Sequence, residues 1–152
     1  MKAVIQRARN AAVKVDGKIT GAIDRGLLVY LGVAADDIEK DADWMADKAA
    51  NIRIFEDDHG KMNLSIKNLE AEEKTGILAV SQFTLLGDAS KGRRPYYGAA
   101  AEPEKANALY EYFIQKIIEQ GLICESGVFQ ARMDVSYTND GPVTILLDSR
   151  SS

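Results

Sequence analysis

The sequence is poor in the side chains that most often carry chemistry, since its 152 residues include one histidine, His59, and one cysteine, Cys124. A single cysteine excludes an internal disulfide, so we expect a reducing compartment, the cytoplasm. One histidine and one cysteine are too few ligands for a Cys/His zinc site. We interpret the paired aspartates at 36–37 and 57–58 as helix-cap and turn residues. We therefore expect neither a metal nor a cofactor.

Both scarce residues have ordinary structural interpretations. His59 stands in an acidic turn before Gly60, where we expect a solvated side chain rather than a catalytic one. Cys124 lies in an apolar stretch and is interpreted as a small core residue, because nothing nearby in the sequence would lower its pKa. These interpretations argue against the most common arrangement for acyl transfer, a nucleophile activated by histidine.

Long apolar runs, repeats and low-complexity stretches are also missing. No run approaches the roughly 20 residues of a membrane-spanning helix, and Met1–Arg7 becomes polar too early for a signal peptide. The net charge of −4 argues against a protein that coats nucleic acid non-specifically, but it leaves room for a local basic patch. Hydrophobic residues make up 46% and charged residues 28%, as in ordinary globular proteins. We expect one domain over residues 1–152, with neither membrane nor DNA as a partner.

Several short segments have the pattern of strands. Alternating residues around Asp16-Gly17 predict a hairpin, and the apolar runs 26–33 and 76–80 predict buried strands. Alternation within 130–138 predicts a half-buried strand, and 143–147 predicts a last strand after a break at Gly141-Pro142. Shorter strands are expected over 52–55 and 62–66.

Two segments have helical spacing. Asp36 or Asp37 is expected to cap a helix whose apolar face runs from Ile38 to Ile52. A second helix is expected to begin near Pro103 and to end at Gly121. We therefore predict a mixed α/β (α+β) fold, in which predominantly antiparallel and mixed sheets form a barrel-like core with peripheral helices.

Two polar segments are the candidates for an active site. Ser81-Gln82-Phe83-Thr84 follows a wholly apolar strand, and such side chains can orient a carbonyl, a water or a ribose hydroxyl. The same residues can equally serve as strand-end groups that bond to nearby backbone. Gly141-Pro142 is a turn by composition, but it also offers bare, rigid backbone that can approach a ligand.

A basic cluster follows the first of these segments. It contains Lys91, Arg93 and Arg94 and is followed by two tyrosines. Arginines pair with phosphates and tyrosines stack on unpaired bases, whereas the alternative is a solvated, charged loop. The position of the cluster beside a polar strand end favours a phosphate-bearing ligand.

Together these segments resemble the D-aminoacyl-tRNA deacylase family. Residues 81–85 match its Ser-Gln-Phe-Thr-Leu motif in full, and residues 139–144 match its Asn-x-Gly-Pro-Val-Thr motif. The likeness covers essentially the whole chain and includes residues 3–7, 25–29, 60–65 and 91–95. Departures at Arg94 and over 99–101 touch neither motif.

The resemblance implies hydrolysis of the ester that joins a D-amino acid, or glycine, to the terminal ribose of tRNA. It also implies a homodimer in which Gly141-Pro142 has a cis bond, enters the partner subunit's pocket and excludes L-amino acids. The catalytic residues implied are Ser81, Gln82, Phe83 and Thr84. The tRNA-binding residues expected are Lys91, Arg93 and Arg94.

The role of Thr84 stays open between a nucleophile and a positioning group. Because the sequence shows no base to activate a hydroxyl, we favour a pocket that positions the ester while a tRNA ribose hydroxyl assists a water. Two further hypotheses are a non-catalytic tRNA-binding module and an esterase for small, uncharged esters.

Overall fold

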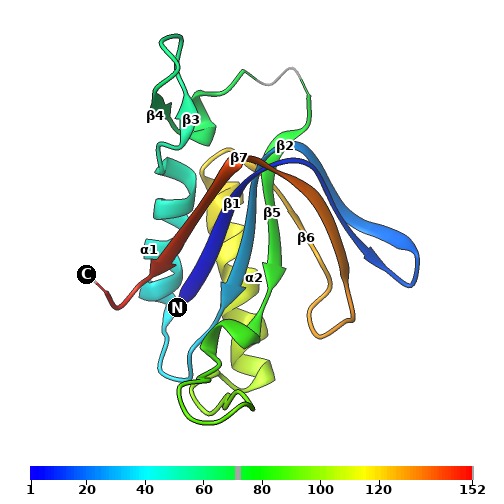
Figure 1. Ribbon diagram of the computed structural model, residues 1–152, viewed down its shortest axis with the longest axis vertical. Helices are drawn as coiled ribbons and strands as arrows, with labels where there is room; N and C mark the ends of the chain where they lie inside the picture. The colour runs from blue at the N-terminus through cyan, green and yellow to red at the C-terminus, as the bar shows by residue number, and fades with distance from the viewer. Residues whose placement is uncertain (71–72, 152) are drawn as a thin grey trace.

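The computed structural model describes residues 1–70 and 73–151, which form one mixed sheet covered by two helices (Figure 1). The strand order is β6-β5-β2-β1-β7. Strand β1 is antiparallel to β2 and β7, whereas β5 is parallel to both β2 and β6. The strands of this sheet are β1 (Lys2–Val15), β2 (Lys18–Gly32), β5 (Thr75–Ser81), β6 (Ile123–Ser126) and β7 (Asp134–Asp148).

The remaining elements are two helices, a small hairpin and two short 3₁₀ turns. They are α1 (Glu39–Asn51), β3 (Phe55–Glu56), β4 (Met62–Leu64), η1 (Ile66–Asn68), η2 (Phe83–Leu86) and α2 (Pro103–Glu119). The predicted mixed α/β fold is confirmed. The long strands bend, but β6 and β7 remain the edges of the sheet, so it is curved rather than closed into a barrel. Neither helix of the described chain is long and apolar enough to cross a membrane.

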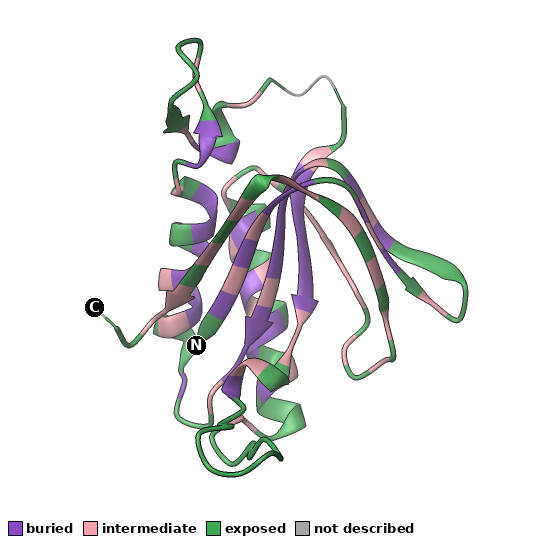
Figure 2. Ribbon diagram, in the orientation of Figure 1, coloured by how far each residue is buried: buried purple, intermediate pink, exposed green. Residues whose placement is uncertain are grey.

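The two faces of the sheet carry separate apolar clusters. On one face, Met45 of α1 and Phe113 of α2 pack with strand residues such as Leu27 and Ile77, all of them buried (Figure 2). The other face holds a smaller cluster that includes Leu28 and is flanked by half-buried aromatic side chains. We call this second side the open face, because both helices lie on the first.

Most of the predicted elements are present. The hairpin turns at Asp16-Gly17, residues 26–32 belong to β2, and residues 76–80 belong to β5. The second helix begins at Pro103, and Gly121 follows its end with a positive φ of 83°. These segments are predictable because each buries a continuous apolar run or face.

The start of α1 differs from the prediction. Its N-cap is Ile38, whose backbone N–H donates to the Asp41 carboxylate at 2.9 Å. Asp37 is buried and accepts hydrogen bonds from the Met1 ammonium at 2.6 Å and the Ala34 N–H at 2.6 Å. Asp36 instead pairs with the Arg150 guanidinium at 2.5 Å. Both predicted cap residues are therefore bonded to groups outside the helix, including residues far away in the sequence. Ile38 is exposed and is not part of the apolar face.

Four strand predictions also need correction. Strand β4 ends at Leu64, because the Asn68 side chain accepts the Ser65 N–H at 2.9 Å and a 3₁₀ turn begins at Ile66. The expected strand over 52–55 is reduced to β3, which begins only at Phe55. The predicted strands over 130–138 and 143–147 form a single strand, β7, which begins at Asp134 rather than Gln130 and runs through Gly141-Pro142 without a break.

The backbones of the parallel strands β2 and β5 come very close to one another at Gly26. A Cβ at Gly26 would lie 1.9 Å from the Gly76 carbonyl oxygen, and Gly26 has a φ of +141°. Any side chain at Gly26 would therefore separate the strands that carry the chain to Ser81.

We predict that Gly26→Ala lowers the free energy of unfolding by about 3 kcal/mol, from the clash and the unfavourable φ together. Gly17→Ala is the matched control, since Gly17 has a φ of +77° but nothing within 4 Å of its Cβ position. It should cost about 1 kcal/mol. Urea unfolding of both variants measures the difference, and equal losses would contradict the prediction.

Candidate active site

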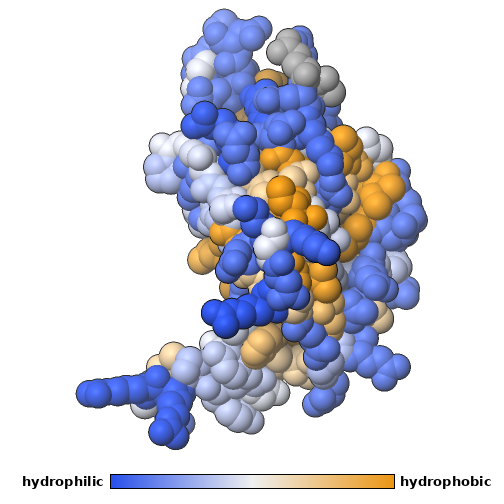
Figure 3. Space-filling view, turned by 90° about the vertical axis from the view of Figure 1, so that its right-hand side faces the viewer, coloured by the Kyte–Doolittle hydropathy of each residue, from blue (hydrophilic) through white to orange (hydrophobic). Residues whose placement is uncertain are grey.

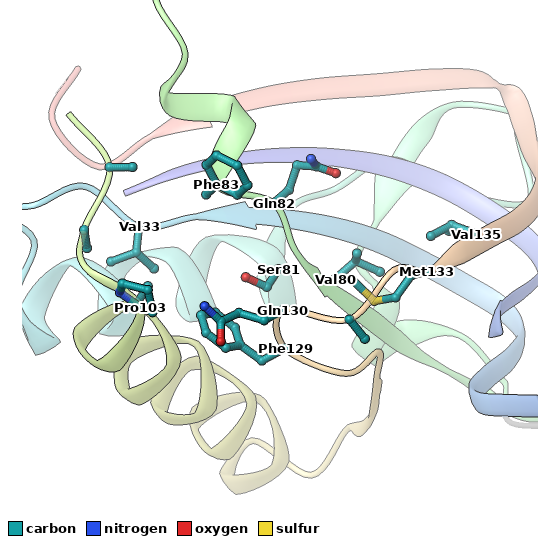
Figure 4. A pocket seen from close by; sticks show the side chains of 14 residues that line it. Val33, Val80, Ser81, Gln82, Phe83, Pro103, Phe129, Gln130, Met133 and Val135 are labelled. Carbon is teal, nitrogen blue, oxygen red and sulfur yellow. The ribbon is translucent and has the colours of Figure 1, made fainter. Parts of the chain in front are cut away.

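A cavity of about 800 Å³ lies where the end of β5 meets the start of α2 and the segment between β6 and β7 (Figure 4). It is lined by Val33, Val80, Ser81, Gln82, Phe83, Ala100, Ala101, Pro103, Ala106, Phe129, Gln130, Ala131, Met133 and Val135. Only Ser81, Gln82 and Gln130 among these have polar side chains. A largely apolar cavity with a few polar groups is typical of a binding site for a small organic group.

The fold brings the Ser-Gln-Phe-Thr segment to this cavity by ending β5 at a packed turn. The Gln82 N–H donates to the Leu31 carbonyl at 2.8 Å, which extends the pairing of β5 with β2 by one residue. The chain then enters η2, whose Leu86 is buried. A Cβ at Gly32 would lie 2.6 Å from Leu86 Cδ2 and 2.9 Å from the Gln82 carbonyl oxygen. The turn therefore packs directly against a glycine of β2.

The four predicted catalytic residues are adjacent but face different surroundings. Ser81, Gln82 and Phe83 line the cavity, whereas Thr84 does not. Thr84 is exposed, and its hydroxyl accepts a hydrogen bond from the Gln82 carboxamide nitrogen. Phe83 is 56% exposed and packs edge-on against Tyr97, with ring centroids 5.1 Å apart.

The scarce titratable residues lie outside this site. His59 is exposed in the turn between β3 and β4. Cys124 is half-buried on β6, and burial raises the pKa of its thiol to about 12. The thiolate is the nucleophilic form of cysteine, so this thiol is inert near neutral pH. Burial also raises the pKa of Tyr110, whose hydroxyl donates to the Ala79 carbonyl at 2.8 Å.

Gly141 and Pro142 lie in a bulge on the edge strand β7. Gln6 of β1 pairs with Thr144 and Ala8 pairs with Asn139, so two steps along β1 face five along β7. Gly141 and Pro142 are exposed, and the bond between them is cis, as the family resemblance implied. The bulge therefore presents backbone, rather than a long side chain, to the outside.

Side chains on both strands hold this bulge in place. The Asn139 carboxamide accepts the Val143 N–H at 3.2 Å and donates to the Thr144 hydroxyl at 3.1 Å. Beneath it, buried Arg7 donates from Nε to the Asp140 carbonyl at 3.1 Å and from Nη1 to the Ile54 carbonyl at 2.8 Å. The exposed backbone at 141–142 is thus supported from within the fold.

Within one chain, the two predicted segments do not meet. Ser81 lies in register with Leu31 and, across β2, with Ala3 of β1, whereas the bulge lies beside Arg7. Four residue steps of about 3.3 Å and three strand spacings of about 4.8 Å place the bulge roughly 20 Å from Ser81.

The basic cluster lies on the exposed loop between η2 and α2. Lys91, Arg93 and Arg94 are all exposed, and none of them lines the cavity. The loop closes through a two-residue bridge, in which Asp88 and Tyr96 exchange backbone hydrogen bonds of 2.8 and 2.9 Å. Through Tyr97, which contacts Phe83, this loop adjoins one wall of the cavity.

The wall opposite Ser81 was missed by the sequence analysis. Phe129 and Gln130 come from the turn after β6, Met133 directly precedes β7, and Val135 lies at the start of β7. The alternation over 130–138 shows only that Met133 and Val135 share a face, and nothing local marks Gln130. Arg7 was also missed, because its partner carbonyls are at Ile54 and Asp140.

Comparison with known proteins gives one consistent result. The model of the family described as D-Tyr-tRNA(Tyr) deacylase matches residues 4–148. Two curated relatives named D-aminoacyl-tRNA deacylase come from Koribacter versatilis and Kosmotoga olearia. The first is 57% identical over 150 residues, covering 99% of this chain and 98% of the relative. The second is 60% identical over 151 residues, with the same coverages.

Two solved structures agree in fold. One, described as a c-Myc DNA unwinding element binding protein, has a TM-score of 0.88 and 39% identity, covering 99% of this chain and all of that one. The other, a probable eukaryotic D-amino acid tRNA deacylase, has a TM-score of 0.75 at 16% identity, covering 96% and 97%. The resemblance found in the two motifs is thereby confirmed, and the chain belongs to the D-Tyr-tRNA(Tyr) deacylase family.

Proposed function

We propose that this protein is a hydrolase that cleaves the ester of D-aminoacyl-tRNA and releases the D-amino acid and the tRNA. The observation that carries the proposal is the placement of the family motif, since Ser81, Gln82 and Phe83 form the polar end of an apolar cavity. The enzyme would act where aminoacyl-tRNA is used, in the cytoplasm, and without a metal or cofactor.

The chemical character of the cavity fits an aminoacyl-adenosine end. Apolar walls accommodate a base and an amino-acid side chain, and the few polar groups orient the ester between them. Gln82 and Ser81 supply hydrogen bonds for the carbonyl or the ribose. In this arrangement the Phe83 side chain does not react. Phe83 instead helps to position the substrate and supplies backbone groups of the turn.

Thr84 is not set up as a nucleophile. In the described part of the chain, its hydroxyl has one hydrogen-bond partner, the Gln82 amide nitrogen, and an amide does not accept a proton. We propose that a water attacks the ester carbonyl, the bond from this carbon to the ribose oxygen breaks, and a neighbouring ribose hydroxyl assists. The protein then positions and polarises the substrate.

The selection of D-amino acids is proposed to come from the Gly141-Pro142 bulge of a second subunit. The bulge is exposed and held by Arg7 and Asn139, yet it lies roughly 20 Å from the cavity of its own chain. In a homodimer it would enter the partner's cavity and clash with an L side chain. Ten-thousandfold discrimination requires about 5.5 kcal/mol, which such a clash supplies.

Exclusion of L side chains by the bulge also predicts that glycyl-tRNA is a substrate. Glycine has no side chain on its α-carbon, so a backbone segment that blocks L side chains has nothing to clash with. We propose glycyl-tRNA as a second substrate on this ground.

The open face of the sheet is the proposed dimer surface. Leu146 is 76% exposed and lies on this face, because its neighbours Ile145 and Leu147 pack against the helix-side core. Half-buried Tyr30 and Tyr137 lie on the same face. A view from the right-hand side of Figure 1 shows a hydrophobic strip through the middle of the molecule (Figure 3).

The loop that carries Lys91, Arg93 and Arg94 is proposed to contact the tRNA backbone. All three side chains are exposed, and the loop adjoins the cavity through Tyr97. Phosphates next to an aminoacyl end in the cavity would then lie within reach of the arginines. This assignment concerns a local patch and is compatible with the net charge of −4.

The function is tested by one assay with D-tyrosyl-tRNA and L-tyrosyl-tRNA, in which released tyrosine is measured over time. Release from the D substrate alone is the expected result. Binding without release would instead support a tRNA-binding module, and equal cleavage of both would support a general esterase. Duplex DNA serves as a competitor control, because one structural relative is described as a DNA-binding protein.

We predict that Thr84→Ala retains deacylation within about tenfold of the parent, because no base activates this hydroxyl. Thr84→Val is the matched control that keeps the branched shape. Rates are measured under single-turnover conditions, and folding is checked by circular dichroism. A loss of 10²-fold or more in folded Thr84→Ala, the size expected for a lost base or nucleophile step, would contradict substrate-assisted hydrolysis.

We predict that Leu146→Asp converts a dimer into a monomer and abolishes D-selective deacylation. An exposed position should leave the fold of the subunit intact. Met62→Asp is the control, since Met62 is 57% exposed on the separate β3–β4 hairpin. Analytical ultracentrifugation measures the association. A monomer with full, D-selective activity would overturn the shared pocket.

A further inference from the structure

Gln130 has a backbone conformation that its residue type does not favour. In the described residues, three non-glycine positions have positive φ: Asn10 at 51°, Asp16 at 50° and Gln130 at 63°. Asparagine and aspartate tolerate this region, whereas glutamine rarely adopts it. An unfavourable conformation that a fold maintains is a common feature of functional sites.

A turn in the cavity wall imposes this conformation. The Ala131 N–H donates to the Val128 carbonyl at 3.1 Å, so Phe129 and Gln130 are the central residues of the turn. A positive φ at the second central position is the requirement of a type II turn, where glycine or asparagine is usual. The local backbone therefore gives no reason for glutamine.

Gln130 lines the cavity and is exposed in the single chain. It extends toward the region of Ser81, beside the Phe129 ring (Figure 4). Across residues 1–70 and 73–151, neither the Gln130 carboxamide nor the Ser81 hydroxyl has a hydrogen-bond partner, whereas Gln82 is already paired with Thr84. Gln130 thus offers a solvent-accessible donor and acceptor in one plane, beside the apolar lining residues Phe129 and Ala131.

The group best matched to a lone carboxamide is an adenine base. Adenine presents a ring-nitrogen acceptor next to an amino donor, and a carboxamide satisfies both at once. The neighbouring Phe129 offers an aromatic surface for the base. Amino-acid side chains vary between substrates, so a fixed carboxamide has no constant partner there. The terminal adenosine is common to all tRNAs.

We propose that Gln130 is a specificity residue that recognises the terminal adenine of the tRNA through paired hydrogen bonds. The assignment rests on the proposed function, because it assumes that the cavity receives an aminoacyl-adenosine end. It adds recognition of the base to the positioning of the ester by Ser81 and Gln82.

The test uses a stable analogue, D-tyrosine joined by an amide to 3′-amino-3′-deoxyadenosine, and its purine counterpart without the 6-amino group. Binding of both is measured by calorimetry to the full chain and its variants. Gln130→Gly removes the carboxamide and suits a φ of 63°, while Gln130→Asn keeps a carboxamide. Asn10→Gly is the matched control at an exposed positive-φ position outside the cavity.

The parent and Asn10→Gly should bind the adenine analogue at least about tenfold more tightly than the purine analogue. In Gln130→Gly this ratio should fall to near one, with Gln130→Asn between the two. Failure of the parent to prefer adenine or to bind either analogue, or an unchanged preference in Gln130→Gly, would overturn the proposal. Hydrolysis of D-tyrosyl-tRNA is measured separately, so loss of the proposed function is distinguishable from loss of base recognition.

Discussion

The parallel pairing of β2 with β5 is the constraint on which the site depends. Most residues of the paired stretch are buried, and the absence of a side chain at Gly26 lets the backbone of β2 approach that of β5, while Gly76 gives the same room to Ile123 of β6. This pairing determines where β5 ends and therefore where Ser81 and Gln82 emerge. Gly32, at the end of β2, then gives the η2 turn room to pack. The position of the polar motif thus follows from backbone contacts of small residues.

The second segment depends on a different kind of support. The bulge at Gly141-Pro142 adds residues to an edge strand, and bulges at edges re-aim the chain away from the sheet. Its polar groups are satisfied by Asn139 on the same strand and by Arg7 from the neighbouring one. A segment supported by these hydrogen bonds keeps its conformation where it projects from its own subunit. The proposed exclusion of L side chains in a partner's cavity requires such a fixed conformation.

The sequence predicts those parts of the structure that rest on local pattern. The β1–β2 hairpin, the buried run in β5 and the apolar face of α2 are visible in residue spacing alone. The start of α1 is not, because Asp36 bonds to Arg150, which is 114 residues away in the chain, and Asp37 bonds to Met1, which is 36 residues away. The wall formed by Phe129 and Gln130 is likewise set by how the β6–β7 segment folds back over Ser81.

The surroundings of Thr84, Cys124 and His59 agree with what the scarcity of histidine in the sequence predicts. Thr84 receives a hydrogen bond from an amide, Cys124 has a raised pKa, and His59 lies in a distant exposed turn. Among residues 1–70 and 73–151, none of these three side chains lines the cavity. What the cavity does offer is shape together with neutral donors and acceptors, which stabilise developing charge without changing their own protonation. In the proposed mechanism, hydrolysis in such a site relies on the substrate's own hydroxyl and on placement of the ester. We propose that the discrimination between substrates comes from contacts remote from the reacting bond, at Gly141-Pro142 for the amino acid and at Gln130 for the base.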